Sequence, residues 1–127
     1  MALVFLTTEM VQRIHEDQIQ RYGGSPGLRD MGLLESAVAM PQACFGAQYL
    51  HTDLFEMAAA YLFHLVKNHP FADGNKRVGA MTAYAFLELN GRSLEASEKE
   101  FGDLTLSVAD GKTGKSAVAE FFRKHAR

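Results

Sequence analysis

At 127 residues the chain has room for one hydrophobic core of modest size, so we expect a single domain over residues 1–127. Its composition, with 47% hydrophobic and 22% charged residues, is that of a folded protein and excludes a disordered tail. The formal net charge of -2 argues against a strongly basic nucleic-acid binder, so no direct nucleic-acid partner is expected.

The longest apolar run, residues 57–63, is far shorter than the roughly 20 residues that a membrane-spanning helix needs. The first ten residues, MALVFLTTEM, contain no basic region and no small-residue cleavage site, so we expect no secretory signal. Cys44 is the only cysteine, which excludes an internal disulfide and fits a reducing compartment, and its thiol is expected to be buried. These features predict a cytoplasmic protein with no membrane partner.

Four segments before Asn90 show the apolar spacing of helices. Residues 8–21 are predicted to form an amphipathic helix, and residues 33–40 a short one. Residues 53–68 are apolar on almost all sides, which predicts a central buried helix. A second apolar helix is expected over residues 75–89. Its inward side chains are predicted to be Val78, Met81, Ala85, Phe86 and Leu89.

Two more helices are expected towards the C-terminus. Ser97 and Glu100 have the spacing of a capping box and open a helix that runs to about residue 109. A last helix begins at Thr113 or Gly114. Because no strand of useful length appears outside residues 4–6, the fold class is predicted to be all-α.

The connection between the two central helices has the sequence HPFADGNKR, residues 69–77. Gly74 permits a positive φ and lets a phosphate approach the backbone at the start of a helix, where free N–H groups favour anions. Asn75 can donate from its amide, and Lys76 and Arg77 can neutralise phosphate oxygens. This end of the helix is therefore a predicted anion site.

Three further residues of this stretch have a possible chemical role. A carboxylate beside a polyphosphate commonly binds Mg²⁺, which would explain Asp73 among so many donors. His69 can act as a general base towards an attacking hydroxyl, and Phe71 can anchor the loop in the core. A helix-end histidine, an Asp-Gly turn and a solvated Lys-Arg pair are each common structural features. Their convergence on one loop favours a functional site.

HPFADGNKR resembles the signature motif of the Fic/Doc superfamily, and it resembles the Doc branch more closely than the Fic branch. Lys76 stands where the Fic branch has its third motif glycine, and Ala80 stands where that branch has its second arginine. The segment RYGGSPGLRDMGLLESAV, residues 21–38, is similar to the Doc-type segment after the first helix. The length of the chain also matches that of a Doc toxin without extensions.

The resemblance implies a compact six-helix bundle of the Fic/Doc type, with the active-site loop between two central helices. It implies a toxin encoded beside a small Phd-like antitoxin, whose C-terminal segment folds onto the toxin and covers the active-site groove. The activity implied is that of a protein kinase, which transfers the γ-phosphate of ATP to a hydroxyl. The family target is a threonine of elongation factor Tu, whose phosphorylation arrests translation.

The resemblance also implies roles by position in the motif. His69 would be the general base, and Asp73 would bind Mg²⁺. The nucleotide site would comprise the anchor, the anion hole and the two phosphate-binding cations: Phe71, Gly74, Asn75, Lys76 and Arg77. The catalytic set would be His69, Asp73, Lys76 and Arg77.

Two other functions remain open at this point. One is a Fic-like adenylyltransferase, which the glycine at position 74 favours. The other is a non-catalytic module that regulates transcription with its antitoxin. The glycine-rich loop at residues 23–32 is either a plain connector or a flap over the site, in which Arg29 and Asp30 would be the functional residues.

Several other features have structural interpretations. ADGKTGKS, residues 109–116, imitates a phosphate-binding loop but lacks its first glycine and its preceding strand, so we expect a helix end, a turn and a helix start. His64 is expected to be a core histidine whose ring nitrogen is satisfied. His15 and His51 have no spacing typical of metal ligands.

Overall fold

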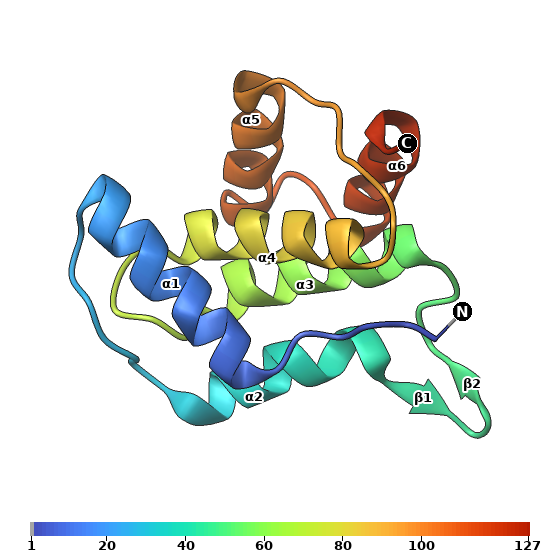
Figure 1. Cartoon of the computed structure of the whole chain (residues 1–127), viewed down its shortest axis with the longest axis horizontal. Helices are drawn as coiled ribbons and strands as arrows, with labels where there is room; N and C mark the ends of the chain where they lie inside the picture. The colour runs from blue at the N-terminus through green and yellow to red at the C-terminus, as the bar shows by residue number, and fades with distance from the viewer. Residues whose placement is uncertain (1) are drawn as a thin grey trace.

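The computed structural model describes residues 2–127, and Figure 1 shows a helical protein built around two central helices. In chain order the elements are α1 (Thr8–Tyr22), α2 (Met31–Ala39), the 3-10 helix η1 (Met40–Gln42), β1 (Cys44–Phe45), β2 (Gln48–Tyr49), α3 (Leu54–Asn68), α4 (Asn75–Leu89), α5 (Glu98–Ala109) and α6 (Lys115–His125). These six α-helices confirm the predicted all-α bundle.

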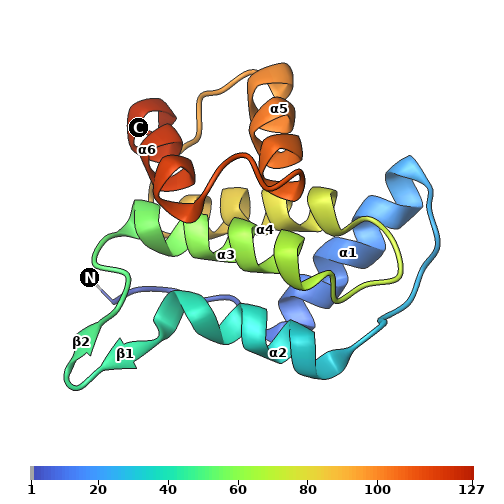
Figure 2. The ribbon, with the colours of Figure 1, turned by 180° about the vertical axis from the view of Figure 1, so that it is seen from behind.

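The centre of the fold is the pair of helices α3 and α4, which lie side by side in both views (Figures 1 and 2). On one side of this pair stand α5 and α6, and on the other lies α2. Tyr61 of α3 is fully buried, its ring lies 5.1 Å from that of Phe86 on α4, and its hydroxyl accepts a hydrogen bond from the Leu6 N–H. The predicted central buried helix is therefore confirmed.

The buried face of α4 differs from the predicted one. Val78 and Phe86 are buried as expected, but Met81 and Leu89 are 36% and 46% exposed. The buried side of α4 consists of pairs of adjacent residues that recur every four positions: Val78, Gly79, Thr82, Ala83, Phe86 and Leu87. Since only this face packs on α3, the prediction was wrong for Met81 and Leu89.

Most helices begin within about two residues of their predicted starts. Asp53 is the N-cap of α3, and its side chain accepts a hydrogen bond from the Glu56 N–H. The capping box of Ser97 and Glu100 opens α5 as predicted. Residues 109–116, which imitate a phosphate-binding loop, form the turn from α5 to α6, and Gly114 is the N-cap of α6. Helix α2 begins two residues earlier than predicted, because Asp30 caps it.

The strands are two residues long and form one antiparallel hairpin between η1 and α3. Residues 4–6, the predicted candidate strand, are not in a strand. Cys44 lies on β1 and is exposed, so the expected buried thiol was wrong: the hairpin projects from the bundle and buries neither strand. No helix within residues 2–127 combines the length and the hydropathy needed to cross a membrane.

Candidate active site

The motif of residues 69–77 connects α3 to α4 at one end of the central pair. His69 is the C-cap of α3 with φ 54° and ψ 53°, and among residues 2–127 it is the one residue other than glycine with a positive φ. The Arg29 guanidinium donates from Nε to the carbonyl oxygen of His69 at 2.8 Å and from Nη2 to that of Asn68 at 3.2 Å. The left-handed conformation is strained for a residue other than glycine. The hydrogen bonds from Arg29 therefore help to hold His69 in this conformation.

A strap, residues 23–30, lies along the motif. The backbone N–H groups of Arg29 and Asp30 donate to the Pro70 carbonyl at 2.8 and 3.0 Å, and the Ala72 N–H donates to the Gly27 carbonyl at 3.1 Å. These bonds form an isolated antiparallel bridge between Leu28 and Phe71. The glycine-rich loop is thus bonded to the motif backbone and is more than a plain connector.

The Asp73 carboxylate is held in place by backbone N–H groups. Its Oδ2 accepts from the Ser25 N–H at 3.1 Å, and its Oδ1 accepts from the Gly74 N–H at 2.8 Å. These hydrogen bonds lower the pKa of the Asp73 carboxyl, and the charges of Arg77 and Lys76 lower the pKa further. Asp73 is therefore an exposed, ionised carboxylate at neutral pH.

The N-terminus of α4 is open to a ligand. Gly74 is the N-cap with φ 78°, and no side chain among residues 2–127 caps this end of the helix. The first-turn N–H groups and the helix dipole favour an anion there. The Lys76 ammonium is exposed, and none of the ion pairs formed within residues 2–127 uses it.

These groups line one pocket of about 490 Å³. Its lining includes six of the predicted site residues: His69, Asp73, Gly74, Asn75, Lys76 and Arg77. Val66 and Lys67 of α3 and Ala109 of α5 complete it. The structure thus brings a histidine, a carboxylate, an uncapped helix end and three cations, Lys67, Lys76 and Arg77, together in one pocket.

Phe71 and Asn75 serve the loop itself. Phe71 is 1% exposed and packs in the core, which confirms the predicted anchor, but it does not line the pocket. The Asn75 side chain accepts from the Phe71 N–H and donates to the Phe71 carbonyl, both at 3.0 Å. The amide of Asn75 therefore closes the loop on itself, and one of its two side-chain N–H donors is used in doing so.

Arg77 ties α4 to the end of α1. Its Nη1 donates to the Gln18 carbonyl at 3.3 Å and its Nη2 to the Gly23 carbonyl at 3.0 Å. The guanidinium also lies 5.9 Å from the centre of the Tyr22 ring. Arg77 contributes positive charge to the pocket while two of its donors bind carbonyl groups of α1 and of the strap, whereas the exposed Lys76 ammonium is available to a ligand.

His15 contacts the motif from α1, although its spacing in the sequence predicts no functional role for it. His15 is 3% exposed, and its ring stacks on that of Phe71 with 3.9 Å between the ring centres. One signal was present in the sequence: the buried face of α1 carries Val11, His15 and Gln18 at helical spacing, and two of these three are polar.

The donor set around Asp73 fits Mg²⁺ only together with phosphate. Within the described chain no group of three or more His, Cys, Asp or Glu residues can hold a metal ion. Mg²⁺ is usually bound through one or two carboxylates, with water and substrate phosphates filling the remaining positions. An exposed ionised carboxylate beside an anion-binding helix end satisfies that requirement.

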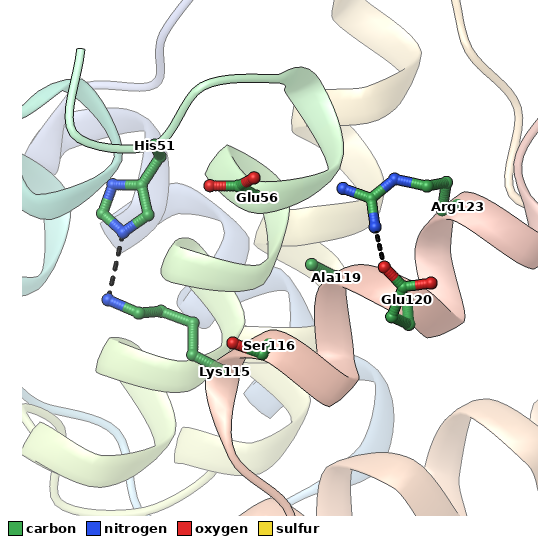
Figure 3. Close-up of a pocket in the computed structure, with 7 residues that line it drawn as sticks. All are labelled: His51, Glu56, Lys115, Ser116, Ala119, Glu120 and Arg123. Atoms are coloured by element: carbon green, nitrogen blue, oxygen red, sulfur yellow. Dashed lines mark hydrogen bonds and ion pairs between the residues drawn. The ribbon is translucent and has the colours of Figure 1, made fainter.

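A second pocket, of about 230 Å³, lies between the start of α3 and α6 and contains no residue of the motif (Figure 3). Lys115 Nζ donates to Nε2 of His51 and to Nε2 of His64, both at 3.0 Å. Burial and the Lys115 charge lower the pKa of His64 to about 4. The ring nitrogen of His64 is satisfied as predicted, but the residue is half-buried and does not belong to the core, because its ring faces Lys115 at this pocket.

Comparison with known proteins agrees with this geometry. The model of the Fic/DOC family matches residues 5–87, so the chain belongs to the Fic/DOC family. A relative named Protein kinase doc, from Escherichia phage P1, is 37% identical over 119 residues, which cover 94% of this chain and 93% of that protein. Toxin Doc from Mycolicibacterium smegmatis (strain ATCC 700084 / mc(2)155) is 44% identical over 75 residues, 59% of this chain and 58% of that protein. Within the family the chain is therefore of the Doc type.

Proposed function

We propose that this protein is a toxin that acts as an ATP-dependent protein kinase and phosphorylates a serine or threonine hydroxyl of a translation factor. One observation carries the proposal: His69, Asp73, Lys76 and the uncapped start of α4 meet at a single pocket. The name of the phage relative, Protein kinase doc, supports phosphoryl transfer. Transfer of this kind needs mainly positioning and charge neutralisation, which a short loop can supply.

In the proposed reaction the hydroxyl oxygen of the target attacks the γ-phosphorus of ATP. The bond from that phosphorus to the β,γ-bridging oxygen breaks, ADP leaves, and His69 takes the hydroxyl proton. The open backbone N–H groups of the first turn of α4, which begin at Asn75, and the Lys76 ammonium stabilise the phosphate charge, while the Gly74 N–H holds the Asp73 carboxylate. Asp73 would hold Mg²⁺, whose contribution is to neutralise phosphate oxygens.

Arg77 has a supporting part in this proposal. Because its guanidinium donates to two carbonyl groups of α1 and the strap, it adds positive potential to the pocket from a fixed position. Phe71 supports the proposed nucleotide site indirectly, as the buried anchor of the loop. Lys76 is the residue proposed to contact the phosphates directly.

The deciding experiment uses the purified protein, Mg²⁺ and ATP labelled at either the α- or the γ-phosphate, with elongation factor Tu or a translation extract as target. Label from the γ-phosphate alone, on a threonine or serine, is the expected result. Label from the α-phosphate would show an adenylyltransferase instead. No transfer from either position, combined with unchanged growth arrest by a His69→Ala variant, would show a non-catalytic module.

Matched substitutions make the experiment specific for the site. His69→Ala and Asp73→Asn are expected to reduce transfer by at least a hundredfold, since they remove the base and the proposed Mg²⁺ ligand. His125→Ala on α6 and Asp103→Asn on α5 change the same residue types away from the pocket. These two controls are expected to retain activity within about twofold of the unchanged protein.

We further propose that a small Phd-like antitoxin covers this face of the protein. An apolar hollow of about 300 Å³ adjoins the site between α4 and α5, and it shares Lys76 and Arg77 with the pocket. Leu106 lies in its wall and is 50% exposed. An apolar side chain of a helical antitoxin segment fits such a surface.

Leu106→Glu tests the antitoxin proposal. The variant is expected to arrest growth as before but to escape neutralisation by the co-expressed antitoxin, because a charge replaces an apolar contact. Leu89→Glu, a substitution of a similarly exposed leucine at the other end of α4, is the control. Neutralisation of both variants to the same extent would place the antitoxin elsewhere.

A further inference from the structure

The contact between α1 and the motif is made by one buried side chain. His15 Nε2 lies 2.7 Å from the carbonyl oxygen of Asp73, a residue 58 positions away in the sequence. A carbonyl oxygen can only accept, so Nε2 carries the hydrogen and donates. The ring planes of His15 and Phe71 are inclined by 8°, so the two rings are nearly parallel. A single imidazole therefore contacts two residues of the motif in two different ways.

Both contacts act on the part of the loop that presents Asp73. The Phe71 backbone is already fixed by the Asn75 side chain, so stacking of His15 fixes the position of the imidazole relative to the loop. The hydrogen bond then sets the peptide plane that follows the Cα of Asp73. From that Cα the carboxylate reaches the N–H groups of Ser25 and Gly74. The imidazole itself does not line the pocket.

A side chain at Gly24 would disturb the same carboxylate. A Cβ built on Gly24 would lie 2.7 Å from Asp73 Oδ2, so the strap leaves the Asp73 side chain little free space on this side. The carboxylate is thus enclosed by the strap on one side and supported through its backbone by His15 on the other. Such a surrounding shell is what holds a reactive group in one geometry.

We propose that His15 is a positioning residue, which fixes the Asp73 backbone so that the Asp73 carboxylate is aimed into the pocket for binding of Mg²⁺ and ATP. The expected effect on Mg²⁺ and ATP binding rests on the proposed function, whereas the expected effect on the conformation of the loop does not. Loss of the hydrogen bond leaves the carboxylate in the protein and lets it take other orientations. A misplacement of about 1 Å can lower the rate of a positioned reaction a hundredfold.

Three substitutions separate the two contacts of His15. His15→Gln keeps a side-chain N–H donor and loses the ring, His15→Phe keeps the ring and loses the donor, and His15→Ala loses both. His125→Phe is the matched control, because His125 also lies against a phenylalanine, Phe121, with 4.2 Å between ring centres but away from the motif. All variants are checked for folding by thermal unfolding.

The first measurement is amide hydrogen exchange, which does not require activity. In His15→Phe the amides of Ser25 and Gly74 are expected to exchange at least tenfold faster, because their acceptor is the Asp73 carboxylate. Amides in the buried centre of α3 are expected to be unchanged. His15→Gln is expected to restore most of the protection. Unchanged exchange at Ser25 and Gly74 in folded His15→Phe would overturn the proposal, whatever the activity of the protein.

The second measurement is calorimetric binding of ATP with Mg²⁺, together with kcat and KM. In His15→Phe binding is expected to weaken about tenfold and kcat to fall, with recovery in His15→Gln. A purely structural contact would lower Tm in both variants and leave binding by the folded molecules unchanged, and that result would also overturn the proposal. If the unchanged protein neither binds ATP nor transfers phosphate, the proposed function fails, and exchange alone decides the role of His15.

Discussion

Gly79 of α4 approaches α3 so closely that no side chain fits between them. A Cβ built on Gly79 would lie 2.9 Å from Val66 Cγ2 and 3.2 Å from the backbone carbonyl oxygen of Leu62. The Val66 side chain can move, but the carbonyl belongs to the helix backbone and cannot move alone. This approach sets the spacing of the two helices that hold the loop of residues 69–77 between them.

Gly79→Ala is therefore expected to destabilise the protein. The extra methyl group forces α3 and α4 apart, at a cost of about 1–3 kcal/mol in the free energy of unfolding, more than the gain in helix propensity. Gly102→Ala on α5 is the control, since no heavy atom lies within 4 Å of a Cβ built there, and it is expected to stabilise by up to about 1 kcal/mol. Urea unfolding measures both. Equal effects of the two substitutions would contradict the close approach.

Lys76 and Arg77 are neighbours in the sequence and differ in role. Lys76→Gln is expected to leave Tm within about 1 °C of the starting value, because the ammonium is exposed and makes no ion pair within residues 2–127. The same substitution is expected to weaken ATP binding at least tenfold, because it removes a charged donor to phosphate. Arg77→Lys loses the two hydrogen bonds to α1 and the strap, so it is expected to cost about 1–3 kcal/mol of stability.

Thermal unfolding and calorimetric ATP binding of the two variants test whether Lys76 binds the phosphates and Arg77 stabilises the fold. The opposite pattern, with a destabilised Lys76→Gln and a stable Arg77→Lys that fails to bind ATP, would show that Arg77 is the phosphate contact. Lys112→Gln, in the turn after α5, serves as a control for the removal of a lysine outside the pocket.

Acid is expected to destabilise the protein through His64. Its pKa is about 4 in the folded protein and 6.5 ordinarily, because burial and the charge of Lys115 disfavour the imidazolium. The unfolded chain therefore takes up the proton first, and the free energy of unfolding falls as the pH drops from 6.5 towards 4. Above pH 6.5 this group has no effect. Because His64 is only half-buried, solvent screens part of this effect, and the expected loss is on the order of 1–2 kcal/mol.

His64→Gln keeps an acceptor for Lys115 and cannot be protonated, so it should flatten the dependence of stability on pH between 6.5 and 4. His125→Gln is the control, and its profile should follow that of the starting protein. His51 and Glu56 also face Lys115, so some slope is expected to remain. Identical profiles for His64→Gln and the starting protein would show that another group senses the acid.

Asp53 performs two functions whose energies can be separated. Its Oδ1 caps α3 through the Glu56 N–H at 2.8 Å, and its Oδ2 accepts from Arg123 Nη2 on α6, also at 2.8 Å. Asp53→Ala removes both and is expected to cost about 1–2 kcal/mol. Asp53→Asn retains a capping oxygen and should cost less than about 1 kcal/mol, because the ion pair is partly exposed and therefore screened by solvent. Equal losses measured by urea unfolding would assign the stability to the ion pair.

Much of the architecture was predictable because its signals are local. The buried α3, the capping box at Ser97 and the end of α4 at Asn90 each follow from a few neighbouring residues. The predicted inward face of α4 differed from the observed one, because apolar spacing alone does not determine which side of a helix packs on its neighbour. In the structure Gly79 and Ala83 are buried and Met81 is exposed. The hairpin at Cys44 was missed because its strands are two residues long.

The sequence by itself determined which chemical groups this protein has at its site and where they stand along the chain. HPFADGNKR places a histidine, a carboxylate, a glycine and two cations between two core helices. These groups lie close together because they are consecutive residues of one short loop. Only the tertiary structure decided how these groups are held. The stack of His15 on Phe71, the strap on Pro70 and the bonds from Arg77 to α1 join residues more than 35 positions apart. Such contacts depend on how helices pack, and no local pattern specifies that packing.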